Sequence, residues 1–127
     1  MSIGFSASDC IALPQFAWQV YRTCRDASSE FEDLASDVES MHEVLKDVQT
    51  LVENHMLDDA SKIRLATVLK GCHDVLKTIE NKLEKHKSLG TNKKRVWDRL
   101  RWGMDSVGDV RARLVLRTTI LTSSLAA

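Results

Sequence analysis

Histidine and cysteine are the residues of this sequence best suited to metal binding or nucleophilic catalysis, but their spacing favours neither. The four histidines form no His-Glu-x-x-His pattern, and the three cysteines form no Cys-x-x-Cys pattern. His73 follows Cys72, but consecutive helix residues point in different directions and do not converge on one ion. The sequence also lacks a Gly-rich phosphate loop. We therefore expect no enzyme, no catalytic residue, no metal, no cofactor and no small-molecule substrate.

A basic and aromatic segment has the composition of an anion-binding surface. Arg95, Arg99 and Trp102 are spaced i, i+4, i+7 and therefore share one ridge of a helix. Such a ridge binds anionic headgroups, phosphate or an acidic protein face, or else Trp102 packs on a neighbouring helix and the arginines are solvated. No groove-reading motif accompanies it, so no nucleic acid is expected. The candidate surface residues are Lys93, Lys94, Arg95, Arg99, Arg101 and Trp102.

Two long helices are predicted by apolar residues that recur at alternating intervals of three and four positions. The first series runs from Phe31 to Val52, and the second runs from Leu65 to His86. Ser29 and Glu32 predict a capping box for the first helix, and the acidic pair at 58–59 predicts an N-cap for the second. The short polar turn between the two series predicts an antiparallel helical hairpin.

The first and last predicted helices are less regular than these two. The segment from Ser8 to Asp26 is apolar nearly all round before Tyr21, and Pro14 predicts a kink or a split in it. A helix that is apolar on every side either lies at the centre of a bundle or enters an apolar medium. The last segment has a buried stripe as far as Leu114, and its β-branched continuation is predicted to stay helical.

Four helices in alternating direction predict an all-α fold, an up-down four-helix bundle. A length of 127 residues suits a single core, and one proline and five glycines are too few for an all-β fold with frequent turns. The single domain is expected to fill residues 1–127, with helices over about 8–26, 29–54, 59–87 and 92–122.

The formal net charge is zero, but acidic and basic residues occupy different segments. Residues 28–60 contain ten acids and one base, whereas residues 61–127 contain fifteen bases and six acids. Opposite charges on neighbouring helices either pair within the bundle or form an acidic and a basic face used for self-association or partner docking.

The cellular location follows from the cysteines and from the uncharged runs. Three widely separated cysteines indicate reduced thiols rather than a disulfide framework. The longest uncharged run, Cys10–Tyr21, has twelve residues, fewer than the ~20 needed to span a bilayer. Without a basic segment before an unbroken apolar core, no signal peptide is expected. We therefore expect a cytoplasmic chain, which moves to a membrane if it acts there.

The sequence resembles one protein family over essentially the whole chain, and four stretches carry the resemblance. The stretches read GFSASDCIAL, YRTCRDA, LKGCHDVL and WDRLRWG, and they lie at Gly4–Leu13, Tyr21–Ala27, Leu69–Leu76 and Trp97–Gly103. They resemble the HeLo-like N-terminal domain of fungal STAND proteins, which are NLR-type receptors often followed by NACHT or ankyrin modules. The resemblance implies a helical bundle similar to fungal, plant and animal cell-death effectors.

By the same resemblance, the domain is a signalling module that self-associates when its receptor oligomerises, and that binds or attacks membranes. In such bundles the apolar N-terminal helix is the segment that enters the membrane, although Pro14 departs from a smooth amphipathic helix. The alternative is a helical scaffold that binds itself or a partner protein through its charged faces and has no membrane activity. The membrane-interaction candidates are Ile3, Phe5, Ile11, Leu13 and Phe16.

Overall fold

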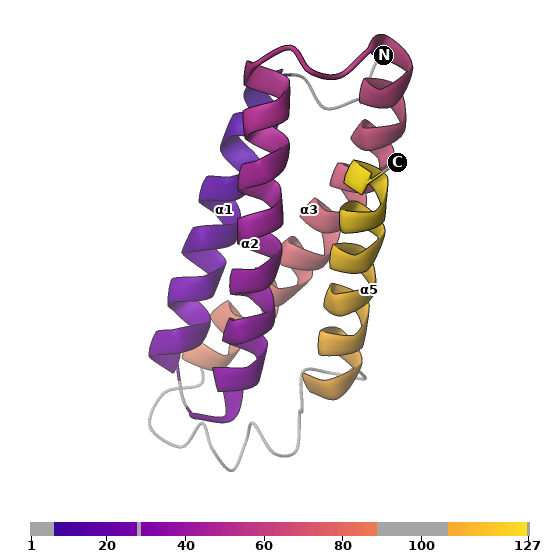
Figure 1. Ribbon diagram of the computed structural model, residues 1–127. Coiled ribbons are helices and arrows are strands. Elements are labelled where there is room, and N and C mark those ends of the chain that lie inside the picture. Colours follow the sequence, from indigo (N-terminus) through magenta and orange to yellow (C-terminus); the bar gives the residue numbers. More distant parts are fainter. Residues whose placement is uncertain (1–6, 28, 89–106, 127) are drawn as a thin grey trace.

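A computed structural model describes residues 7–27, 29–88 and 107–126, and within these ranges the chain is helical and contains no strand. The four α-helices of these ranges are α1 (Ala7–Ala27), α2 (Glu32–Glu53), α3 (Asp59–Ser88) and α5 (Val107–Ala126), and a short 3₁₀ turn, η1 (Ser29–Phe31), precedes α2. The four helices form one bundle (Figure 1). The prediction of an all-α, four-helix architecture is therefore confirmed.

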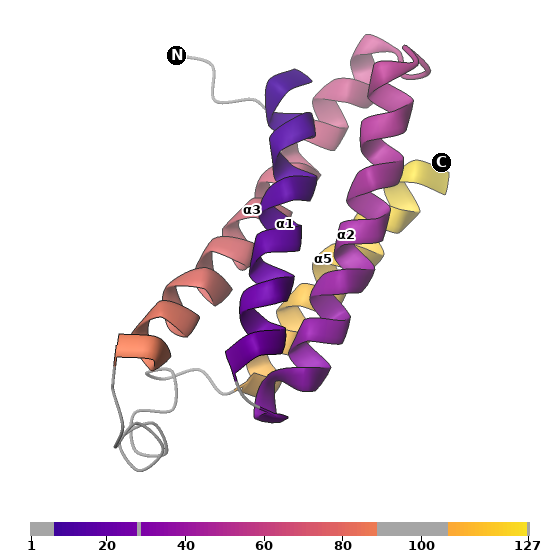
Figure 2. The ribbon, with the colours of Figure 1, turned by 90° about the vertical axis from the view of Figure 1, so that its left-hand side faces the viewer.

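The helices alternate in direction and occupy the four corners of the bundle. α1 packs against α2 and α3, and α5 packs against the same two helices, so α2 and α3 lie at opposite corners (Figures 1 and 2). The connection between α2 and α3 crosses one end of the bundle (Figure 1). These two helices are therefore antiparallel, as predicted, but they do not lie side by side. The hairpin prediction is wrong on this point, because α1 and α5 flank α2 instead.

The core is built from the predicted apolar series. Each of these side chains is at most 5% exposed, and burying a large aliphatic side chain contributes ~1.5–3 kcal/mol. The alternating three- and four-residue intervals keep them on one side of each helix. From α2 they are Leu34, Val38, Met41, Leu45 and Val48, and from α3 they are Leu65, Leu69, Cys72, Leu76, Ile79 and Leu83.

The two long helices begin in different ways. The Asp58 carboxylate accepts a 2.7 Å hydrogen bond from the backbone N–H of Ser61, which caps α3 as predicted and lowers the pKa of Asp58. The predicted capping box of Ser29 and Glu32 is wrong. Ser29 lies in η1, and the N-cap of α2 is Phe31, whose side chain makes no capping hydrogen bond. Phe31 is fully buried instead, so packing rather than a polar cap fixes this end of α2.

The turn after α2 closes with hydrogen bonds typical of a helix C-terminus. The backbone N–H of Met56 donates to the Leu51 carbonyl at 3.0 Å, and the N–H of His55 donates to the Val52 carbonyl at 3.1 Å. His55 has φ of 54°, the left-handed conformation that this pattern requires. The chain can therefore leave α2 and enter α3 within a few residues.

The irregular helices agree with the sequence in part. α1 continues through Pro14 as one helix, so it is not split there, and the kink stays a prediction. α5 buries Val110, Leu114 and Leu121 and extends to Ala126, four residues beyond the expected end. The predicted beginning of this helix, at residues 92–106, lies outside the described residues.

Candidate functional site: the first helix and its contacts

One side of α1 forms part of the bundle core. Leu13, Ala17, Val20 and Cys24 repeat at intervals of four, three and four residues, and each is at most 3% exposed. This face packs against α2 and α3. Ala17 has only a methyl side chain and is 0% exposed, so neighbouring side chains pack close to the α1 backbone at this position.

The membrane-interaction candidates are distributed unevenly over this helix. Leu13 lies in the buried face, and Phe16 is partly buried against the core. Ile11 lies in α1, but its side chain is outside the described part of the structure, as are Ile3 and Phe5 entirely. Of the membrane-interaction candidates, the two that the structure places, Leu13 and Phe16, are thus buried or partly buried in the bundle.

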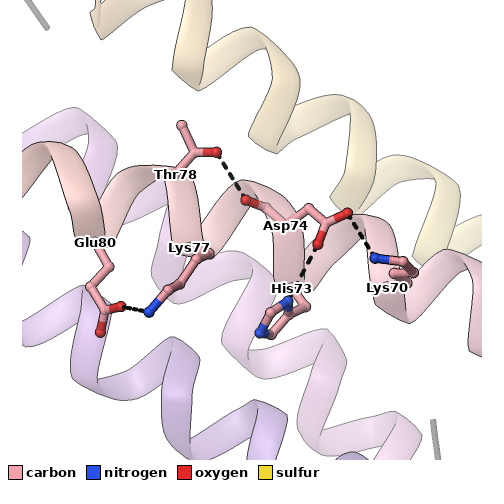
Figure 3. A network of polar contacts seen from close by, with 6 residues as sticks. All are labelled: Lys70, His73, Asp74, Lys77, Thr78 and Glu80. Carbon is pink, nitrogen blue, oxygen red and sulfur yellow. Dashed lines mark hydrogen bonds and ion pairs between the residues drawn. The ribbon is translucent and has the colours of Figure 1, made fainter. Parts of the chain in front are cut away.

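Phe16 marks the edge where α1 meets α3. Its ring lies beside that of His73, with ring centroids 5.7 Å apart. His73 Nδ1 is 3.4 Å from the Asp74 carboxylate, which also lies 3.4 Å from Lys70 Nζ (Figure 3). An aromatic contact on α1 is therefore continuous with a chain of polar contacts on the outside of α3.

Trp18 and His42 mark the edge where α1 meets α2. Their ring centroids are 5.1 Å apart, and the Trp18 side chain remains 39% exposed. His42 is 9% exposed, and its buried Nδ1 makes no hydrogen bond within the described part of the chain, although the Glu43 carboxylate lies 3.5 Å away. The imidazole of His42 therefore packs on the Trp18 ring, and its buried Nδ1 has no hydrogen-bond partner among the described residues.

A shallow groove of about 710 Å³ follows this α1–α2 edge. Trp18 provides its exposed apolar surface, while both signs of charge are present around it. Open grooves of this kind suit contact with another protein surface better than enclosure of a small molecule. The lining residues are Pro14, Gln15, Trp18, Gln19 and Arg22 from α1, and Glu39, His42, Glu43, Lys46 and Gln49 from α2.

The buried cysteines have a structural role in this fold. Cys24 and Cys72 are both free thiols, and burial raises the pKa of each to about 12. The reactive thiolate is therefore scarce at neutral pH. Among the described residues, no group of three or more histidine, cysteine or acidic side chains is placed to hold a metal ion.

Sequence reasoning missed the contact between Trp18 and His42. Both residues lie off the apolar series, and only the packing of α1 on α2 brings them together. The one available signal was that Trp18 precedes Val20 by two positions and so falls outside the buried face. The basic and aromatic candidates Lys93, Lys94, Arg95, Arg99, Arg101 and Trp102 lie outside the described residues.

None of the helices in the described ranges is both long and apolar enough to cross a bilayer. Comparison with family models, with curated proteins and with solved structures finds no match to this chain.

Proposed function

We propose that this chain is the N-terminal signalling domain of a fungal NLR-like protein, and that it oligomerises and associates with anionic membranes in regulated cell death. The domain acts without catalysis, and it moves from the cytoplasm to the membrane when triggered. Two lines support the proposal: the resemblance of four sequence stretches to HeLo-like domains, and the position of α1. The observation that carries it is that the apolar face of α1 is enclosed by α2 and α3.

The mechanism has two states. At rest, Leu13 and Val20 are buried in the core together with the smaller Ala17 and Cys24. Release of α1 exposes these side chains, at ~1.5–3 kcal/mol for each large one. Contact with lipid or with neighbouring copies offsets this cost, so a trigger that favours such contact shifts the population toward the open state.

A matched pair of variants tests whether release of α1 controls membrane binding. Ala17→Leu adds bulk to a fully buried position, and overpacking of this kind costs ~1–3 kcal/mol. Gln19→Leu adds similar apolar surface to an exposed position of the same helix. Binding and dye leakage are measured on vesicles of phosphatidylcholine with phosphatidylserine, and on phosphatidylcholine alone.

The proposal expects Ala17→Leu to bind and permeabilise the anionic vesicles more strongly than the parent chain, by about 5–150-fold when the open state governs binding. Gln19→Leu is expected to behave as the parent does. Fusion to a trimeric coiled coil should raise leakage for both. If the trimeric fusion neither binds nor permeabilises anionic vesicles, the membrane function is wrong.

The second candidate is an interaction scaffold without membrane activity. It is favoured by the separation of acidic and basic residues onto α2 and α3, which lie at opposite corners of the bundle. Salt distinguishes the two candidates, because contacts between exposed charges weaken as the Debye length falls, whereas burial of α1 in lipid does not depend on such pairs.

A further inference from the structure

The two most highly charged helices lie at opposite corners of the bundle. α2 contains seven acidic residues and one base, Lys46, whereas α3 contains seven bases and four acids. Because α1 and α5 separate them, these helices do not lie side by side within one copy (Figure 2). One edge of the bundle is therefore acidic, and the edge across from it is basic.

Part of the acidic charge on α2 is matched within the bundle. Arg111 on α5 donates to the Asp37 carboxylate at 2.7 Å and lies 3.7 Å from Asp33. Lys46 lies 3.3 Å from Glu43 on α2 itself.

Three other acids of α2 have no such partner among the described residues. Between residues that the structure describes, no ion pair joins Glu32, Glu39 or Asp47 to a base, and all three side chains are exposed. Clustered acidic charge at an exposed edge attracts a cationic surface.

Two of the basic residues of α3, Lys70 and Lys77, are paired with acids of the same helix. Lys70 lies 3.4 Å from Asp74, and Lys77 lies 2.8 Å from Glu80 (Figure 3). Both lysine side chains are 55% exposed. Exposed pairs three or four residues apart are weak, so an acidic partner can compete for these ammonium groups.

We propose that the acidic edge of one copy, at Glu39 and Asp47, docks on the basic edge of a second copy, at Lys70 and Lys77. This inference deepens the self-association in the proposed function by naming its surfaces. The spacings agree: Glu39 and Asp47 are eight residues apart, about 12 Å along a helix, and Lys70 and Lys77 are seven residues apart, about 10.5 Å. Because α2 and α3 run antiparallel, a translated copy brings Asp47 toward Lys70 and Glu39 toward Lys77.

The charges also select the symmetry of this contact. A two-fold contact of α2 on α2 would oppose two acidic surfaces, which electrostatics disfavours. The contact of α2 on α3 joins different surfaces, so a pair of copies keeps one unused acidic edge and one unused basic edge. The assembly therefore grows by addition of further copies, as a ring or a linear array, and it dissociates as salt screens the charges.

Charge reversal on either edge tests the proposal with the full chain. One variant is Glu39→Lys with Asp47→Lys, and the other is Lys70→Glu with Lys77→Glu. Sedimentation velocity is measured over a concentration series in about 10 mM salt, where the Debye length is about 30 Å, and in about 1 M salt, where it is about 3 Å. We expect the parent to associate at low salt only, and each variant alone to associate at least about tenfold more weakly.

Mixing the two variants gives the decisive measurement, because the reversed edges are then complementary between them. The mixture is expected to regain association, and circular dichroism confirms that each variant is folded. The control, Arg25→Glu on α1, reverses one exposed charge outside the α1–α2 groove and should still associate.

The proposal is overturned if the parent stays monomeric at low salt, if the α1 control weakens association equally, or if mixing restores nothing. Each of these results is obtained in solution without lipid. They therefore leave vesicle binding by α1 to be judged separately, and a chain that permeabilises vesicles without this contact retains the proposed function but not the proposed surfaces.

Discussion

The two diagonals of the bundle differ in their surfaces while they share one core. The corners formed by α2 and α3 carry eight and eleven charged residues, respectively, whereas α1 and α5 carry four each. The charged diagonal is segregated by sign. The neutral diagonal exposes the large apolar side chains of Trp18 on α1 and of Val115 and Leu116 on α5, whereas on the charged diagonal Ile63 of α3 is exposed among charged residues. A net charge of zero therefore conceals two kinds of surface, one suited to salt-sensitive contacts and one suited to apolar contacts.

Apolar residues should stabilise this fold only where they face the core, so the exposed apolar side chains of the neutral diagonal should contribute little to stability. The largest expected effect tests this expectation. Phe31→Ala removes a fully buried ring at the beginning of α2 and should lower the free energy of unfolding by ~3–5 kcal/mol. Leu116→Ala, at a side chain that is 56% exposed, should change it by less than ~0.5 kcal/mol. Urea denaturation measures both, and similar losses would break the comparison.

The next effect concerns the thiols, which lie on both diagonals: Cys24 on α1 and Cys72 on α3. Burial raises the pKa of each thiol to about 12, from the ordinary thiol value of 9.0. Between pH 9 and pH 12 the unfolded chain loses the thiol protons while the native chain keeps them. Stability should therefore be full below pH 9 and fall as the pH rises, by up to ~1.4 kcal/mol per pH unit for each thiol.

Lysine and tyrosine titrate in the same range, so a control variant isolates the thiols. The Cys24→Ala, Cys72→Ala chain should show a shallower fall of the unfolding free energy between pH 9 and pH 12. At pH 8 the native parent should also react slowly with a thiol reagent at both positions. Fast labelling of the folded chain, or equal pH slopes for the two chains, would show that the thiols are not enclosed as described.

The sequence predicted the charged diagonal better than the neutral one. On α2 and α3 the apolar residues form a single narrow series between many charged residues, so the buried face is unambiguous. On α5 the stretch around Val115, Leu116 and Ile120 is apolar on several sides. Periodicity then cannot tell which side faces the core, although Leu121 is buried and Leu116 is not.

Which helices contact one another could not be predicted from the sequence, for a different reason. The periodicity of a helix gives the direction of its buried face but not the identity of the neighbour that covers it. Hence the buried faces of α2 and α3 were predicted, whereas the placement of these two helices at opposite corners of the bundle was not. The same limit applies at the α1 edges, where His42 and His73 each meet an aromatic residue of α1.

The two α1 edges provide a third prediction. His42→Phe keeps a ring against Trp18 and removes the buried Nδ1 that makes no hydrogen bond in the described structure. The unfolding free energy should rise by ~1 kcal/mol, because an unsatisfied buried polar atom is lost. His73→Phe is the matched control on the other edge, where the imidazole contacts Asp74, and it should give no gain. If His42→Phe destabilises the chain, the imidazole has a partner that the ring packing does not reveal.

The smallest expected effect lies where the charged α3 meets the neutral α5. Gly71 is inside α3, and a Cβ added there would lie 2.7 Å from Nη1 of Arg117 on α5. Arg117 is exposed and flexible, so its guanidinium can move away, while alanine gains ~1 kcal/mol over glycine in a helix interior. Gly71→Ala should therefore stabilise the chain by up to ~1 kcal/mol in thermal or urea denaturation.

The same substitution in an Arg117→Ala background completes a double-mutant cycle. If the guanidinium merely moves aside, Gly71→Ala should give nearly the same gain in both backgrounds. A gain that appears only without Arg117 would mean that the glycine is required to seat this arginine against α3. In that case Arg117 of α5 would belong to the basic surface of α3, and this surface would extend from the charged diagonal onto the neutral one.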